Sequence, residues 1–290
     1  MTTTTTAWLA DGHSRSQLRR GIEAGTLLRL RRGFLLTDPT AAQLHLARVR
    51  AAADVLEPGC YVCHVSAAVV HGLPVTGPLP DRVHVLRTGG GHGYINEVLH
   101  SHRGAFEPEH GTLISGIPVT SVVRTVADLV RRLPFPEAVV VADAAARREV
   151  DLDQVLALTT RGRGCRMAKR ALCFADARSE SPGESLSRAL MHLHDVPEPV
   201  LQHPFSDASG REVCRVDFWW PRFRVAGEFD GLTKYTDLVD SNETAADVVR
   251  RERRRERLLS DRGVRVIRWL ADDLRTPARF GWWLRQQLHE

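Results

Sequence analysis

Acidic side chains interrupt two apolar, aromatic-rich runs in the last third of the chain, at Asp217, Glu228 and Asp230. The runs cover 213–220 and 223–229, and a Pro-Arg pair separates them, so the pattern predicts two strands joined in a hairpin. Because residues two apart share one face of a strand, Glu228 and Asp230 are expected to lie together. The hairpin is expected to bring Asp217 beside Glu228.

Carboxylates gathered among apolar strands repel one another and raise one another's pKa unless a cation lies between them. A hard divalent cation with oxygen ligands meets this need, and we therefore expect Mg²⁺ or Mn²⁺ at Asp217 and Glu228. Each acid taken alone also has a structural interpretation, as a residue of a strand edge or of an Asp-Gly turn. The combination of acids, and not any one of them, predicts the chemistry.

An Asp in one strand followed by Glu-x-Asp-Gly in the next resembles the PD-(D/E)XK nuclease superfamily, in the branch related to very-short-patch-repair endonucleases. The resemblance covers 178–290. It places Glu184, within the segment 181–188, as the glutamate that this family carries on a preceding helix. The segments 250–259 and 263–268 correspond to the family's Arg-rich helix and to the Gly-x-x-Val-x-Arg strand that follows it.

This resemblance implies a restriction-endonuclease-like αβ core that hydrolyses phosphodiester bonds in DNA, in repair or in phage defence. Glu184, Asp217 and Glu228 would bind the metal ion, and Asp230 would complete the catalytic set. Asp230 stands where the superfamily has a lysine, so it would orient or deprotonate the attacking water or bind a second ion. Lys234, four residues further on, is the other candidate for the role of that lysine.

Two other functions stay open at this point. A non-catalytic DNA-binding regulator, similar to a type IV antitoxin and carrying a degenerate nuclease fold, is favoured by Asp230 in place of the lysine. A nuclease that acts on RNA is the third candidate, because no sequence feature reports contact with a 2′-hydroxyl group.

The first 40 residues predict a small winged helix-turn-helix. A capping box at 14–17 begins a helix, and alternating apolar residues around a glycine at 26–36 predict a two-stranded wing. Six arginines face two acids over 1–33, as in DNA-binding modules, although a solvated basic face has the same composition. The segment also resembles the winged-helix N-terminal domain of abortive-infection type IV antitoxins. That resemblance implies operator DNA as a ligand and a toxin or defence-system protein as a partner.

Arginine dominates the basic residues, and the only lysines are Lys169 and Lys234. Arginine suits bidentate phosphate contacts, and the bias also follows from a GC-rich genome. The Arg-rich helix interleaves arginines with acids, so pairing on a solvated surface accounts for part of it. The arginines expected to contact duplex DNA are Arg15, Arg19, Arg29, Arg31 and Arg32 in the head and Arg250, Arg254 and Arg257 on the Arg-rich helix.

The segment 60–64, Cys-Tyr-Val-Cys-His, matches the pattern of c-type haem attachment. Attachment of that kind requires export, and the sequence shows no export signal. We therefore interpret the segment as a strand entering a helix, with cysteines packed as small hydrophobes and neither haem nor zinc bound. Ser66 is expected to cap that helix. His100, His102 and His110 match no zinc-site spacing and are expected at the surface.

Apolar residues make up 43% of the chain and charged residues 26%, with a formal net charge of +5, as in ordinary globular proteins. The sequence shows neither a membrane-spanning apolar run of about 18–20 residues nor a secretory signal. Its five scattered cysteines indicate reduced thiols. We therefore expect a cytoplasmic protein without membrane contact. The expected fold class is α/β (α+β overall) in three parts. They are a winged-helix head at 1–40, an antitoxin-like αβ middle region at 41–177 and a nuclease-like domain at 178–290.

Overall fold

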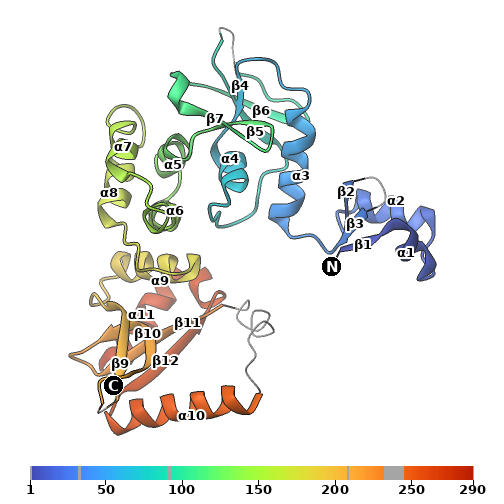
Figure 1. Ribbon diagram of the computed structural model, residues 1–290. Coiled ribbons are helices and arrows are strands. Elements are labelled where there is room, and N and C mark those ends of the chain that lie inside the picture. The colour runs from blue at the N-terminus through green and yellow to red at the C-terminus, as the bar shows by residue number, and fades with distance from the viewer. Residues whose placement is uncertain (1, 32–33, 90–92, 208, 232–244, 290) are drawn as a thin grey trace. The chain divides into compact units, whose positions relative to one another are not determined.

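The computed structural model describes residues 2–31, 34–89, 93–207, 209–231 and 245–289. Helices and strands mix throughout, which confirms the α/β class in its coarse form (Figure 1). The chain forms two compact units, one of 1–132 with 151–165 and the other of 133–150 with 166–290. Each of the three parts predicted from the sequence contains one sheet, while their exact boundaries stay predictions. No helix in the described ranges has the length and apolarity needed to cross a bilayer.

The N-terminal part of the first unit is a small antiparallel sheet with two helices. Its strands run in the order β1-β3-β2, and Ser14 begins α2 with the predicted capping box. Leu18, Leu27 and Leu35 form the buried core, which explains the apolar alternation of the predicted wing. The elements are β1 (Thr2–Thr4), α1 (Thr5–Ala10), α2 (Arg15–Glu23), β2 (Leu27–Arg31) and β3 (Phe34–Thr37).

The rest of the first unit surrounds a mixed five-stranded sheet of order β6-β5-β4-β8-β7. The strands are β4 (Cys60–Val62), β5 (Val83–Arg87), β6 (Leu99–Arg103), β7 (Gly111–Ile114) and β8 (Ile117–Thr120). The helices are α3 (Ala41–Ala53), α4 (His64–His71), η1 (Pro108–His110), α5 (Val122–Val130) and α7 (Leu152–Ala157). Buried valines from α3, β4, β5 and β8 fill the core, as their β-branched shape favours.

Ser66 does not cap α4, contrary to the sequence prediction. The helix begins at His64, after Cys63, so Ser66 lies inside it and is fully buried. Its hydroxyl lies 2.9 Å from Nε2 of His45 and accepts a hydrogen bond of 2.9 Å from the backbone N–H of His84. Ser66 therefore links α3 and β5 through the interior.

The second unit contains the four-stranded sheet β12-β11-β10-β9, in which β11 pairs antiparallel with β10 and parallel with β12. The predicted hairpin is thus confirmed. The strands are β9 (Val200–Ser206), β10 (Glu212–Trp220), β11 (Val225–Asp230) and β12 (Arg265–Leu270). The helices are α6 (Phe135–Arg147), α8 (Cys165–Phe174), α9 (Pro182–Leu193), α10 (Ala245–Asp261), η4 (Asp273–Arg275) and α11 (Pro277–His289).

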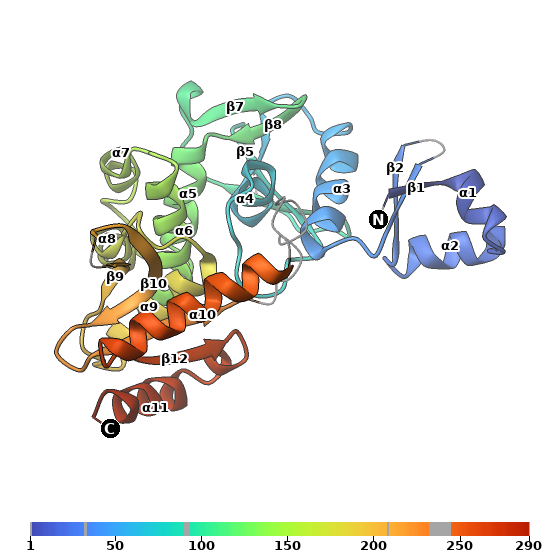
Figure 2. The ribbon, with the colours of Figure 1, turned by 60° about the horizontal axis from the view of Figure 1, so that its bottom comes forward.

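Two apolar layers enclose this sheet. On one face Phe218 and Trp269 pack with residues of α9 and α11, and on the other face Trp219 packs with Leu259 of α10. Figure 2 shows β12 between α10 and α11. The acids of the two central strands therefore lie between covering helices, where solvent compensates their charge poorly.

A buried ion pair fixes α9, the helix that carries Glu184. Asp143 of α6 is fully buried, and its oxygens accept hydrogen bonds of 2.7 and 2.9 Å from the Arg188 guanidinium. The Asp176 N–H adds a bond of 2.8 Å to the same carboxylate, and the guanidinium lies over the Phe174 ring. Arg188 lies one turn beyond Glu184 on α9, so this ion pair also holds the turn of the helix that carries Glu184.

Replacing Asp143 with alanine is expected to lower the free energy of unfolding by about 3–5 kcal/mol, because Arg188 then stays buried without its carboxylate. Urea denaturation followed by tryptophan fluorescence measures this, since five of the six tryptophans lie at 219–283. Asp272→Ala is the control, because Asp272 and Arg275 form a pair whose side chains are both 80% exposed. Equal unfolding midpoints for the two variants would contradict the expectation.

Candidate functional site

Glu184 on α9 and Asp217 on β10 interact through their charges. Glu184 lies in the first turn of α9, is 6% exposed, and accepts hydrogen bonds through Oε2 from the Glu180 N–H at 2.9 Å and from Nε2 of Gln202 at 2.8 Å. Asp217 accepts a hydrogen bond of 2.9 Å from the Phe229 N–H. Burial raises the pKa of Glu184, and the charge of Asp217 raises it further, against the hydrogen bonds that favour the ionised form. The structure therefore brings these two predicted ligands into one electrostatic site.

Glu228 is bound by two arginines. Its Oε1 pairs with Arg255 of α10, and its Oε2 accepts a hydrogen bond of 2.9 Å from Nε of Arg268. The parallel register places Glu228 directly beside Arg268 on β12. The side chains of Glu228 and Arg255 are only 14% and 12% exposed, so this pairing is largely shielded from water. Burial lowers the pKa of Arg255, and the nearby charge of Arg268 lowers it further.

Among the described residues, Glu184 and Asp217 influence each other through their charges, and Glu228 is bound by two arginines. Within those ranges, Glu184, Asp217 and Glu228 do not place one oxygen each within 4.8 Å of one another, the distance that a shared metal ion requires. Asp230 ends β11 two residues beyond Glu228, opposite Leu270 of the parallel strand. Lys234 lies outside the described residues.

Sequence reasoning missed Gln202 and the role of Arg255. No local pattern marks Gln202, because its contact with Glu184 depends on how β9 meets α9. Arg255 had a usable signal. It lies three and four residues before Leu258 and Leu259, which pack against the sheet, so helical periodicity puts Arg255 on the sheet-facing side of α10.

Three of the arginines predicted to contact DNA meet at one surface pocket of the N-terminal part. Arg15 and Arg19 of α2 and Arg29 of β2 line this pocket of about 350 Å³. Nε of Arg19 also lies 3.9 Å from Glu23 in an exposed pair. Arg32 and the side chain of Arg31 lie outside the described residues.

The three arginines predicted on the Arg-rich helix are exposed on α10. They are Arg250, Arg254 and Arg257. Arg254 also pairs with Asp207 at 2.7 Å, so the structure gives it a partner within the protein. The side chain of Arg254 is still 54% exposed, which leaves it within reach of an external phosphate.

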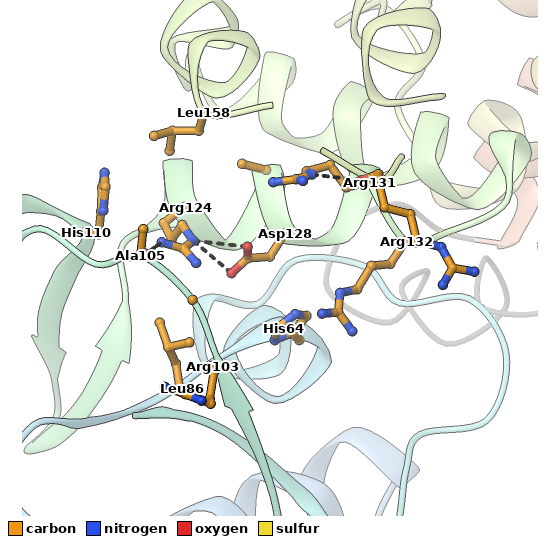
Figure 3. A pocket seen from close by; sticks show the side chains of 13 residues that line it. His64, Leu86, Arg103, Ala105, His110, Arg124, Asp128, Arg131, Arg132 and Leu158 are labelled. Carbon is orange, nitrogen blue, oxygen red and sulfur yellow. Dashed lines mark hydrogen bonds and ion pairs between the residues drawn. The ribbon is translucent and has the colours of Figure 1, made fainter. Parts of the chain in front are cut away.

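A larger, basic pocket of about 730 Å³ lies in the first unit (Figure 3). Its charged lining is Arg103, Arg124, Asp128, Arg131, Arg132 and Arg163, together with His64 and His110. Nε of Arg124 donates to both oxygens of Asp128 at 3.0 Å, and Arg131 donates to the backbone carbonyls of Arg161 and Arg163. Five arginines around one carboxylate make this pocket suited to an anionic group. No sequence pattern indicated this pocket, because its arginines come from three separate segments: β6, α5 with the residues directly after it, and the segment around Arg163.

No family model matches the chain. Two uncharacterised proteins of Mycobacterium tuberculosis, Rv2248 and MT2308, are each 28% identical to it over 268 residues, which span 90% of this chain and 92% of their own length. The crystal structure of the RV2827C protein of M. tuberculosis matches 64% of this chain and 75% of its own, with a TM-score of 0.35 and 15% identity. These similarities assign no function.

Glu184→Gln is expected to gain stability relative to the wild type as the pH rises from 4 to 7 in the presence of a chelator. The pKa of Glu184 is raised by folding, so the folded state binds more protons and the wild type loses stability as the pH rises from about 4.3, the ordinary glutamate value, through the raised pKa. Glutamine removes this loss. Urea denaturation at several pH values measures the difference.

Glu212→Gln is the matched control, because Glu212 is an exposed acid on β10. Its stability is expected to follow that of the wild type across the same pH range. A Glu184→Gln curve that runs parallel to the wild-type curve would contradict the electrostatic account of the site.

Proposed function

We propose that this chain is a metal-dependent nuclease-like protein that hydrolyses phosphodiester bonds in DNA, with its catalytic site in the second unit. The electrostatic interaction of Glu184 with Asp217, which come from different elements, carries the proposal, because each carboxylate raises the cost of ionising the other and a bound divalent cation would offset that cost. The finer architecture belongs to the same proposal: a winged-helix head, an antitoxin-like αβ middle region and a PD-(D/E)XK-type core. The four-stranded sheet with acids on its two central strands supports that core.

The donor set suits Mg²⁺ or Mn²⁺. Carboxylate oxygens of Glu184 and Asp217, with the backbone carbonyl of Phe229, are hard ligands of the kind that these ions prefer. Glu228 would join them only after it leaves its arginine partners. A bound ion would polarise the scissile phosphate and lower the pKa of a water molecule.

The chain's own residues would prepare the reaction. The Phe229 N–H holds the Asp217 carboxylate, and Gln202 holds that of Glu184, so both ligands are oriented before substrate arrives. A DNA phosphate would compete with Glu228 for Arg255 and Arg268, because guanidinium groups bind phosphate oxygens as well as carboxylate oxygens. That exchange would free the Glu228 carboxylate for the catalytic set.

Basic residues would hold the DNA backbone. The pocket formed by Arg15, Arg19 and Arg29 supports contacts of the head with duplex DNA, and the exposed arginines of α10 support contacts near the catalytic site. Phosphate contacts of this kind position a protein on DNA without reading its sequence. A cytoplasmic location and a toxin or defence-system partner belong to the proposal only through the resemblances stated above.

One observation favours a second function, that of a non-catalytic DNA-binding regulator. Arg255 and Arg268 satisfy Glu228 without any metal ion, as in a nuclease fold kept as a scaffold. Asp230 in place of the superfamily lysine also favours the regulator. In that case the head would bind DNA while the second unit serves as a partner surface.

Asp217→Asn is expected to lower the rate of Mg²⁺- or Mn²⁺-dependent plasmid cleavage by at least about 100-fold, because the ion supplies several kcal/mol of transition-state stabilisation. Glu212→Gln, which removes one negative charge from the same strand, is expected to cleave at the wild-type rate. A wild type that binds DNA but neither cleaves it nor binds either ion would rule out the nuclease and leave the regulator. Parallel assays on single-stranded DNA and on RNA define the substrate.

Arg15→Ala combined with Arg29→Ala is expected to weaken DNA binding and to reduce the slope of log K against log salt by about 0.9 for each lost phosphate contact. Fluorescence anisotropy of a labelled duplex at several salt concentrations measures this slope. Arg20→Ala is the matched control for each of the two replacements made singly, because Arg20 lies on the same helix as Arg15, outside the pocket lining. An equal loss in the control would mean that net charge, and not this pocket, governs binding.

A further inference from the structure

Three histidines meet on one face of the five-stranded sheet. His84 lies on β5, and His100 and His102 lie on the adjacent strand β6. The strands pair in parallel, with His84 opposite His100 and Leu86 opposite His102. Residues at alternate positions share a face, so this register points all three imidazoles the same way. The sequence prediction that placed His102 at the surface is wrong, since the residue is only 8% exposed.

The rings converge at the separation that a metal ion needs. One nitrogen from each of His84, His100 and His102 lies within 4.8 Å of the other two. Nε2 of His102 and Nδ1 of His84 are 3.1 Å apart, and the ring centroids are separated by 4.2 to 4.9 Å. Zinc–nitrogen bonds of about 2.0–2.1 Å at tetrahedral angles place two ligand nitrogens about 3.3 Å apart. The rings therefore need little movement to bind.

The charges around the three histidines indicate which type of metal ion they would bind. Burial is the largest cause that lowers the pKa of His84 to about 4 and that of His102 to about 3, so both rings present neutral nitrogen near pH 7. Arg132 is a nearby positive charge that opposes any cation. Mg²⁺ forms weak bonds to imidazole and would not overcome this repulsion, whereas Zn²⁺ binds imidazole nitrogen strongly.

A second cluster shares His102 and is the competing location. Cys63, His64 and His102 also place one ligand atom each within 4.8 Å of one another. Cys63 is fully buried, however, and burial raises the pKa of its thiol well above the ordinary value, so forming the thiolate ligand is costly. The three histidines need no such deprotonation, and His84 and His100 are only half-buried, which gives an ion access.

We propose that His84, His100 and His102 form a binding site for a borderline transition-metal ion of the Zn²⁺ class. Three protein nitrogens leave a fourth position for water or for an anionic group. Such an incomplete shell is typical of zinc sites that bind or activate a ligand. This site is separate from the carboxylate site of the second unit and differs from it in donor type, so neither proposal rests on the other.

The test uses the full chain, stripped with a chelator, loaded with Zn²⁺, dialysed and analysed for metal content. The wild type is expected to retain about one Zn²⁺ per chain. His100→Gln and His102→Gln are expected to lose at least about 100-fold in affinity, more than the loss of an outer-shell partner causes. Circular dichroism establishes that each variant is folded. Replacing His100, which is half-buried, is expected to disturb the fold less than replacing His102. His13→Gln, which removes an exposed histidine of the same unit, and Asp217→Asn are expected to retain the ion.

Co²⁺ in place of Zn²⁺ distinguishes the two clusters by absorption. The proposal predicts a cobalt spectrum without a thiolate charge-transfer band, unchanged in Cys63→Ser. A thiolate band that disappears in Cys63→Ser would place the ion at the other cluster and overturn the proposal. Folded wild-type protein that retains no Zn²⁺ above the content of His102→Gln would overturn it as well.

Discussion

Negative charge enclosed between helices needs a positive partner, and the choice of partner governs what the second unit can do. Glu228 has two arginines, one from the covering helix α10 and one from the neighbouring strand β12. Glu184 accepts hydrogen bonds from the Glu180 N–H and from Gln202, and Asp217 accepts one from the Phe229 N–H; these bonds orient both carboxylates. Burial raises the pKa of Glu184, and the charge of Asp217 raises it further. The divalent cation that we propose at Glu184 and Asp217 would reduce the repulsion between the two carboxylates.

The surrounding fold holds these carboxylates in place. The Asp143–Arg188 pair anchors α9 from one side, and aromatic packing on Phe218 and Trp269 anchors the strands. Such anchoring keeps Glu184 and Asp217 in place despite their repulsion, because neither helix nor hairpin can relax without breaking buried contacts. The histidine cluster of the first unit differs from the carboxylate site in donor type. Its proposed metal site rests on the convergence of one nitrogen from each of three rings.

Local sequence patterns predicted what depends on neighbouring residues. The capping box at Ser14, the β10–β11 hairpin and the helix that begins before Glu184 all follow from caps, turn residues and periodicity within a few positions. Ser66 was assigned wrongly because its hydroxyl bonds two distant elements and not the end of its own helix. The contacts of Gln202 with Glu184 and the meeting of three histidines depend on strand pairing, which no local pattern encodes. The carboxylates could be named from the sequence, but their partners could not.

The most direct measurement is an anomalous-scattering map of crystals of the full chain grown with Mn²⁺. The account predicts a manganese peak within coordination distance of the Glu184 and Asp217 carboxylates, at about 2.1–2.3 Å from their oxygens. Well-ordered carboxylates without a manganese peak between them would contradict it. That result would leave the second unit as a charge-compensated scaffold and the chain as a DNA-binding protein without nuclease chemistry.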